Sequence, residues 1–166
     1  MRRFLIVLLA AAFVGLVSGA VPVAANDDGE IEAEFKTSLS GAEEVPSNTT
    51  QAFGMAEVEL KDQTLRFEVE VCGITGVTQS HIHVGSAGTN GPIVLFLYGF
   101  DPSGSFSAGD CERLSTGILT PANLIPRPAI GINTWDDFVA ALLSGNTYVN
   151  VHTLALPGGE IRGQLD

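Results

Sequence analysis

Hydrophobic and polar residues alternate along much of this chain. From 56 to 71, apolar side chains occupy every second position on either side of a polar turn at 61–64, and glutamates fill most of the positions between them. Successive side chains of a β-strand point to opposite faces, so this stretch predicts a hairpin with one apolar face and one acidic face.

Three further stretches predict strands. Residues 93–98 form a continuous apolar run, the pattern of a strand that is covered on both faces. Residues 148–153 and 160–165 flank the turn-forming sequence Pro-Gly-Gly at 157–159, which predicts a second hairpin. Short strands separated by glycine and proline turns are typical of an antiparallel β-sandwich, and this all-β fold is the one we expect.

One segment follows a helical pattern instead. Four of its apolar residues recur at the spacing of a helix face: Trp135, Phe138, Val139 and Leu142. Thr134 suits the N-cap position before them, and Gly145 suits the stop after them. We therefore expect one short amphipathic helix over residues 135–144.

The first 25 residues have the pattern of a secretion signal. Two arginines at 2–3 precede an uncharged apolar run at 4–17, and small residues follow it. Residues 1–25 therefore predict a signal peptide with cleavage after Ala25; cleavage after Ala20 and an uncleaved anchor are the alternatives. A cleaved signal predicts a secreted protein, extracellular or periplasmic.

Beyond this leader the chain is strongly acidic. The leader holds two of the eight lysines and arginines and none of the nineteen aspartates and glutamates, which leaves a net charge of −13. Such a chain repels nucleic acid and anionic membranes, because both require a basic surface. Residues 26–34 predict a flexible acidic N-terminal arm, and residues 35–166 predict a single domain. No second apolar run approaches the ~20 residues that span a bilayer, so no transmembrane segment is expected after signal cleavage.

The chain has two cysteines, Cys72 and Cys111. An exported chain meets oxidising conditions, in which paired cysteines usually form a disulfide. We therefore expect a Cys72–Cys111 bond; two separate buried thiols are the alternative.

The three histidines are the main candidates for chemistry. His81 and His83 form a His-x-His pair, which places both rings on one face of a strand. His152 shares the more polar face of its strand with Tyr148 and Asn150. Imidazole is a common ligand of late transition metals, so three converging rings would form a metal site. A structural cluster, whose rings bond backbone or carboxylate groups, is the other interpretation.

Two other polar positions carry expectations of their own. Asn150 is expected to be a buried amide that satisfies backbone groups. Glu43 and Glu44 are expected to lie on a solvated loop.

Four blocks of residues, in order, carry a resemblance to a known family. They are Leu-Ser-Gly-Ala-Glu-Glu-Val-Pro at 39–46, His-Ile-His-Val-Gly at 81–85 with Asn-Gly-Pro at 90–92, Gly-Asn-Thr-Tyr-Val-Asn-Val-His-Thr at 145–153, and Pro-Gly-Gly-Glu-Ile-Arg-Gly-Gln-Leu at 157–165. Over about 35–165 the chain resembles the CHRD domain, a module of chordin-type secreted regulators that also occurs singly in microbial secreted proteins. The resemblance implies a β-sandwich and little about activity.

The histidine pattern is also similar to that of the copper/zinc superoxide dismutases. That family has a His-x-His copper pair, a later copper-ligand histidine and an arginine near the C-terminus; here His81, His83, His152 and Arg162 are similar in type and order. The chain lacks a fourth histidine to bridge copper and zinc, and it lacks a zinc cluster. The resemblance implies copper as the metal, Arg162 as a residue behind the ligands, and a superoxide-dismutase-like Greek key as an alternative to an immunoglobulin-like sandwich.

These observations leave three functions. The first is a secreted or cell-envelope CHRD-domain protein that acts as a binding or structural module for an unknown extracellular protein or matrix partner. The second is a secreted copper-type metal-binding protein, with redox activity of the dismutase kind as one form of it. The third is a glycan-binding module, which the low aromatic content of 7% disfavours. No residue is assigned a catalytic role, and we do not expect an enzyme under the first function.

Overall fold

The structure is a computed structural model, and it describes residues 32–166. The predicted signal peptide and residues 26–31 of the predicted arm lie outside this part of the chain. Within it, nine strands pair in antiparallel fashion, and one α-helix interrupts them. None of the helices in this part is long and apolar enough to cross a membrane.

The strands and helices have the following bounds. The strands are β1 (Ala33–Ser40), β2 (Phe53–Lys61), β3 (Thr64–Cys72), β4 (Ile74–Val84), β5 (Ile93–Tyr98), β6 (Phe106–Ala108), β7 (Glu112–Leu119), β8 (Thr147–Thr153) and β9 (Ile161–Leu165). The helix α1 is Trp135–Leu143, and short 3-10 helices lie at Gly41–Glu43, Pro121–Asn123 and Pro128–Ile130.

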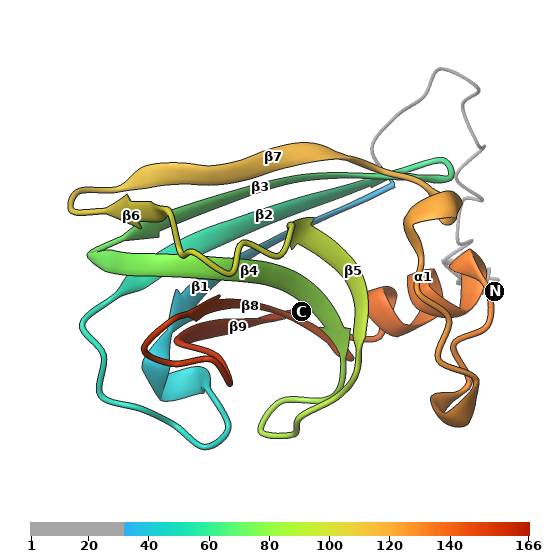
Figure 1. Ribbon diagram of the computed structural model, residues 1–166. Coiled ribbons are helices and arrows are strands. Elements are labelled where there is room, and N and C mark those ends of the chain that lie inside the picture. Colours follow the sequence, from blue (N-terminus) through green and yellow to red (C-terminus); the bar gives the residue numbers. More distant parts are fainter. Residues whose placement is uncertain (1–31) are drawn as a thin grey trace, which may run out of the picture.

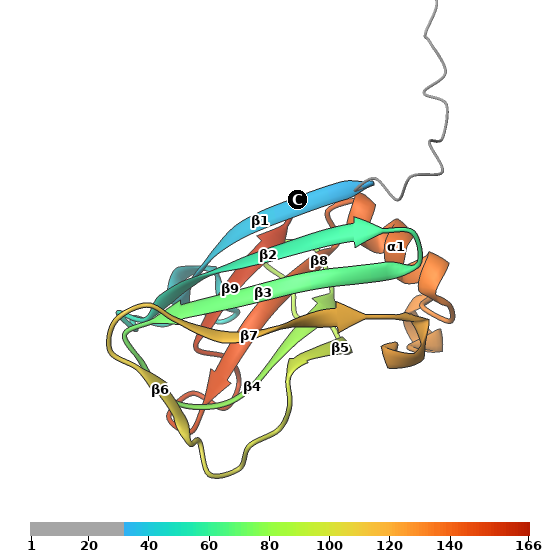
Figure 2. The ribbon, with the colours of Figure 1, turned by 90° about the horizontal axis from the view of Figure 1, so that it is seen from above.

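The strands form one strongly curled sheet that packs against itself as two layers (Figures 1 and 2). The strand order is β5-β4-β8-β9-β1-β2-β3-β7, and β6 pairs with β4. We call β1, β2, β3 and β7 the acidic layer and β4, β5, β8 and β9 the histidine layer. The two layers are joined where Ser40 of β1 pairs with Arg162 of β9. The chain crosses between layers after β3, β6 and β7, as in Greek-key sandwiches, so the predicted all-β fold with one short helix is confirmed.

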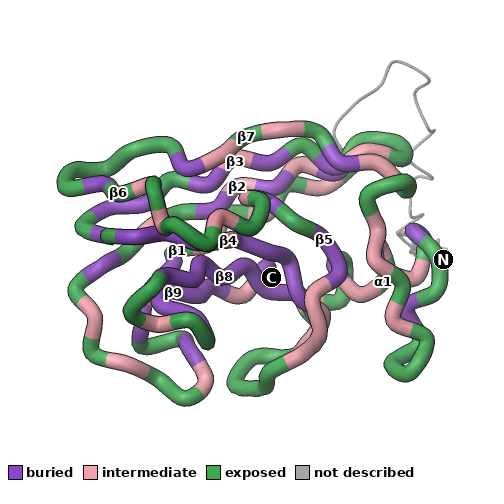
Figure 3. The backbone as a smooth tube through the Cα atoms, in the orientation of Figure 1, coloured by how far each residue is buried: buried purple, intermediate pink, exposed green. Residues whose placement is uncertain are grey.

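The hydrophobic core fills the space between the layers, as the alternating pattern predicted. In the β2–β3 hairpin, Val58 and Leu65 are fully buried in this core. Glu57 and Glu68 are cross-strand neighbours on the outer face. The buried segments of the histidine layer and of the hairpin face each other in Figure 3. One alternation therefore generates both the core and the acidic outer surface.

Helix α1 lies at one end of the layers (Figure 1) and begins at the predicted cap. Thr134 Oγ1 accepts a hydrogen bond from the Asp137 backbone N–H (3.2 Å), and the Asp137 carboxylate accepts one from the Thr134 N–H (2.9 Å). This reciprocal capping box satisfies N–H groups that the first helical turn leaves free. Gly145 follows the helix with a φ of 69°, a left-handed conformation that glycine adopts without strain.

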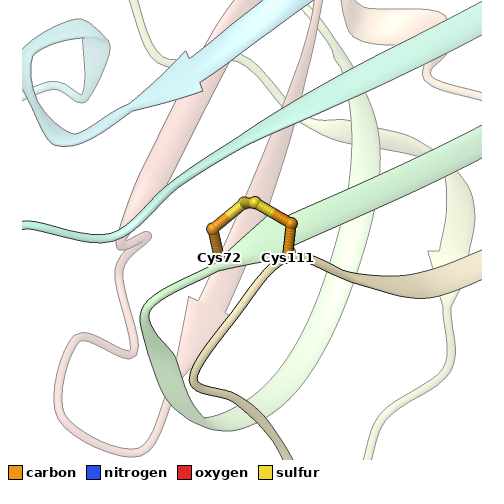
Figure 4. The surroundings of a disulfide bond; sticks show 2 residues. All are labelled: Cys72 and Cys111. Atoms are coloured by element: carbon orange, nitrogen blue, oxygen red, sulfur yellow. A yellow bond between two sulfur atoms is a disulfide. The ribbon is translucent and has the colours of Figure 1, made fainter.

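The predicted disulfide between Cys72 and Cys111 is present (Figure 4). Cys72 is the last residue of β3, and Cys111 immediately precedes β7, the strand that pairs with β3. The bond therefore reinforces the pairing of two strands that are separated in sequence by β4, β5 and β6.

The structure differs from the sequence-based description at both edge strands of the acidic layer, β1 and β7. Ala33 and Glu34, predicted to belong to a flexible arm, lie in β1, because they pair with Leu60 and Glu59 of β2. The folded domain thus begins before the predicted boundary at residue 35. The alternating pattern also did not predict β7, which pairs with β3 and has a glycine, Gly117, in its interior.

Candidate metal centre

Strand pairing brings the three histidines to the outer face of the histidine layer. His81 and His83 lie on β4, and β8 pairs beside it so that Asn150 stands opposite His81 and Tyr148 opposite His83. His152 follows on the same face of β8, while the residues between these positions point into the core. The predicted convergence of the three rings is therefore present; we call His81, His83 and His152 the histidine cluster.

The rings of the histidine cluster are close enough to share an ion. One ring nitrogen from each residue lies within 4.8 Å of the others. His81 Nδ1 and His152 Nε2 are 3.2 Å apart. Two nitrogens that bind one metal at 2.0–2.1 Å in tetrahedral geometry stand about 3.4 Å apart, so this hydrogen-bonded pair of nitrogens already has the spacing of two ligands.

Hydrogen bonds to carbonyl oxygens orient two of the rings. His83 Nδ1 donates to the Gly91 carbonyl (2.8 Å), and His152 Nδ1 donates to the Pro157 carbonyl (3.0 Å). A carbonyl can only accept, so each bond places the ring hydrogen on Nδ1 and leaves Nε2 as a lone-pair donor. Metal-bound histidines are oriented by this kind of second hydrogen bond.

Burial keeps the cluster uncharged. Burial, together with the neighbouring rings of His152 and His83, lowers the pKa of His81 to about 3. Burial likewise lowers the pKa of His83 to about 4, although its bond to Gly91 opposes the shift. The pKa of His152 is also lowered by burial, against the bond to Pro157. All three rings are thus neutral at ordinary pH, the form that binds metal.

Asn150 does not play the role expected for it. Its side-chain Oδ1 lies 3.1 Å from His152 Nε2, so the amide faces the histidine cluster instead of bonding backbone groups. The register opposite His81 places it there.

Arg162 lies behind the cluster and reaches it through Tyr148. The Tyr148 ring stacks on His83, with centroids 4.7 Å apart and planes 8° from parallel. The Arg162 guanidinium carbon lies 3.4 Å from the centre of the same tyrosine ring, a cation–π contact. Arg162 is 1% exposed, so the predicted neighbour of the cluster is a buried cation.

Three connections cover this face of the layer, at 41–52, 85–92 and 154–160, and we call them the covering loops (Figure 1). Arg162 donates to the carbonyls of Ser86 (3.4 Å) and Thr89 (2.9 Å) and to Asn90 Oδ1 (3.3 Å), all in the second loop. Asn90 Nδ2 in turn donates to the Val45 carbonyl of the first loop (2.7 Å). Arg162 therefore holds the loop whose Gly91 carbonyl orients His83.

On the open side the cluster meets an aromatic ring. Phe96 of β5 is the strand partner of His81, and the two rings meet edge to face with centroids 4.6 Å apart. Phe96 is 40% exposed. It forms the boundary between the buried imidazoles and solvent.

Glu44 is a buried group that the sequence analysis placed wrongly. It was expected on a solvated loop, yet it is 6% exposed, and its Oε1 has no hydrogen-bond partner. Burial raises the pKa of Glu44, while the Val45 backbone and the Arg162 charge oppose the shift. The carboxyl packs so closely on Gly159 that no side chain could be accommodated there. Its place in Glu-Glu-Val-Pro, part of the first block that carries the family resemblance, was the available signal.

The donor chemistry of the site is limited to imidazole. Within residues 32–166, one other group has the composition of a metal cluster, Glu70 with Cys72 and Cys111. Its cysteines are joined to each other and so supply no thiolate. Three nitrogen donors suit copper, zinc and neighbouring metals, whereas calcium and magnesium require oxygen.

Comparisons with known proteins identify the domain. The family model of the CHRD domain matches residues 35–165, which span every strand from Phe35 of β1 to Leu165 of β9. No curated protein matches the chain, and no solved structure matches it.

Proposed function

The chain belongs to the CHRD domain family, and we propose that it is an exported binding module whose histidine cluster holds a late transition metal ion, with copper as the first candidate. The carrying observation is that three buried imidazoles each place one ring nitrogen within 4.8 Å of the others. His83 and His152 would bind through Nε2, and His81 would bind through one of its two ring nitrogens. The metal would supply a Lewis acid or, if it is copper, a one-electron centre.

The free ring nitrogens favour a metal over a purely structural cluster. His81 Nε2 and His83 Nε2 are buried and have no hydrogen-bond partner. A buried polar atom without a partner costs about 1–3 kcal/mol. These two atoms are free to bind an ion, whereas a purely structural cluster leaves them without partners.

Arg162 supports the ligands in this proposal without being one. Its cation remains outside the donor set, contacts Tyr148 and fixes the covering loop at 85–92. The loop then presents the Gly91 carbonyl to His83. Arg162 is thus a positioning residue for the His83 ring.

Three features support export. The disulfide is stable in an oxidising compartment and unusual elsewhere. Residues 1–25 have the pattern of a cleaved leader. The net charge of −13 beyond the leader is compatible with solubility outside the cell and argues against nucleic acid as a partner.

Metal content tests the proposal directly. The full chain is expressed without a histidine tag, purified, loaded with copper or zinc, freed of excess by gel filtration and analysed by mass spectrometry of the metal. We expect about one ion per chain, as one cluster of three ligands predicts. The variants His83→Gln and His152→Gln should lose the ion, and Lys61→Gln, an exposed change in the β2–β3 turn, should retain it.

Thermal unfolding of the same proteins provides the control for folding. A metal that binds only the folded state should raise the melting temperature of the parent protein and of Lys61→Gln, and leave the histidine variants unchanged. A triple variant that lacks all three histidines and still binds copper like the parent would refute the site. If the parent protein binds no metal, the cluster is structural, and the module has an extracellular protein or matrix partner instead.

A further inference from the structure

Resting on the proposed metal function, we propose that the histidine cluster selects singly charged copper, Cu(I), over the divalent ions Zn(II) and Cu(II). The donor set carries no negative charge. Among residues 32–166, no aspartate, glutamate or cysteine completes the group formed by His81, His83 and His152. A bound ion would therefore keep its full charge.

A buried fixed charge beside the cluster is positive. Arg162 is 1% exposed and reaches the cluster through the Tyr148 ring. Its hydrogen bonds go to two backbone carbonyls and an amide oxygen, and no ion pair within the described part of the chain includes it. Its positive charge repels a cation at the cluster, and it repels a dication twice as strongly as a monocation.

The two carboxyls buried on the same side form no ion pair with Arg162 within the described residues. The Glu160 carboxylate is bonded by the hydroxyls of Thr50 and Thr153, each at 2.6 Å. Glu44, in the first covering loop, packs on Gly159 of the third; the Arg162 charge acts on it, but burial raises its pKa and so favours its neutral form. Neither belongs to the group of side chains that could hold the ion.

Burial turns this charge balance into selectivity. The cost of transferring an ion from water to a medium of low polarity grows with the square of its charge, so a dication costs about four times as much as a monocation of the same size. A divalent ion with three neutral ligands needs an added anion such as hydroxide. Phe96 and Tyr148 place aromatic rings, and not carboxylates, against His81 and His83. Cu(I) can be held by three neutral nitrogen ligands alone and needs no anion.

Phe96 offers a way to change the charge without touching a ligand or the loop anchor. It stands 4.6 Å from the His81 ring between centroids, and it is 40% exposed, so a polar side chain at this position reaches both the cluster and solvent. Phe96→Glu adds the missing negative charge. Phe96→Gln introduces a side chain of the same shape as glutamate but without the charge, so it is the matched control.

The experiment compares the affinities of Cu(I) and Zn(II) at pH 8 for the full-chain protein and both variants. Cu(I) is measured without oxygen by competition with a chromogenic Cu(I) chelator, and Zn(II) by competition with a zinc dye. For the parent protein we expect Cu(I) to bind at least about 100-fold more tightly than Zn(II), because only the divalent ion is left strongly uncompensated. Phe96→Glu should raise the Zn(II) affinity about tenfold over Phe96→Gln, and the Cu(I) affinity by about threefold or less.

Each result has one meaning. Zn(II) affinity equal to or above that of Cu(I) in the parent protein overturns the inference and leaves the metal site standing. Equal Zn(II) affinities for Phe96→Glu and Phe96→Gln, with both variants melting like the parent, also overturn it. Failure of the parent protein to bind either ion overturns the proposed function itself.

Discussion

At the scale of the residue, burial decides what the three imidazoles can do. Water would stabilise a protonated ring, and the covering loops exclude it, so each ring keeps its lone pair. His83 shows the balance most clearly: the Gly91 carbonyl favours its charged form, and burial together with the Arg162 charge outweighs that bond. Because the buried rings resist protonation, they lower the stability of the folded protein at acidic pH.

This resistance predicts a pH dependence of the metal-free protein. The pKa values of His81 and His83 are about 3 and 4 in the folded state and near 6.5 in the unfolded chain, so between these limits only the unfolded chain takes up the protons. The free energy of unfolding should be highest above pH 6.5 and fall as the pH is lowered. Each such histidine contributes a slope of about 1.4 kcal/mol per pH unit.

The measurement is urea unfolding at several pH values from 4.5 to 7.5, with a chelator present. His83→Gln removes one titrating group, so its curve should be flatter than that of the parent protein, and the difference cancels the contribution of the carboxylates. Parallel curves would show that His83 titrates normally in the folded state.

At the scale of the element, local sequence signals were sufficient to predict the hairpin and the helix, whose patterns do not depend on a distant partner strand. The alternation at 56–71 gave the β2–β3 hairpin, and Thr134 gave the start of α1. Strand β7 was not predicted, because Gly117 interrupts its alternation of apolar and polar residues. A Cβ built there would lie 3.0 Å from the Phe67 ring of β3, so the glycine reflects packing against a partner strand that a local pattern does not reveal.

The α1 cap provides a prediction at this scale. Thr134→Ala removes the oxygen that accepts from the Asp137 N–H and should lower the free energy of unfolding by about 1 kcal/mol. Thr134→Ser retains that oxygen and should stay close to the parent protein. Urea unfolding of the three proteins decides the matter, and equal losses in both variants would mean that the threonine methyl group, and not the cap, stabilises the helix.

At the scale of the whole molecule, the fold class was predictable and the assembled site only partly so. Periodicity showed that His81 and His83 share a face and that His152 lies on a polar face of another strand. That β8 lies beside β4 depends on pairing across some seventy residues, for which no local pattern exists. The burial of Glu44 likewise depends on loops that pack without periodicity.

The disulfide predicts a global effect. Cys72 and Cys111 are 39 residues apart in sequence, and closing a loop of this length restricts the unfolded chain by an amount worth about 3–4 kcal/mol. The double variant Cys72→Ala/Cys111→Ala should therefore unfold at a lower urea concentration than the parent protein. A reductant should lower the midpoint of the parent and leave that of the variant unchanged; coinciding midpoints for both proteins without reductant would contradict the prediction.

The position of β8 between β4 and β9 also fixes the order in which the molecule matures. A chain synthesised as far as β7 already has the His-x-His pair, but it lacks the strand that carries His152 and the strand that carries Arg162. Pairing over such distances in sequence is slow, because the intervening chain must be closed into a loop first. The metal centre is consequently among the last features to form. For a chain exported as we propose, we therefore expect no complete metal centre until both C-terminal strands have paired.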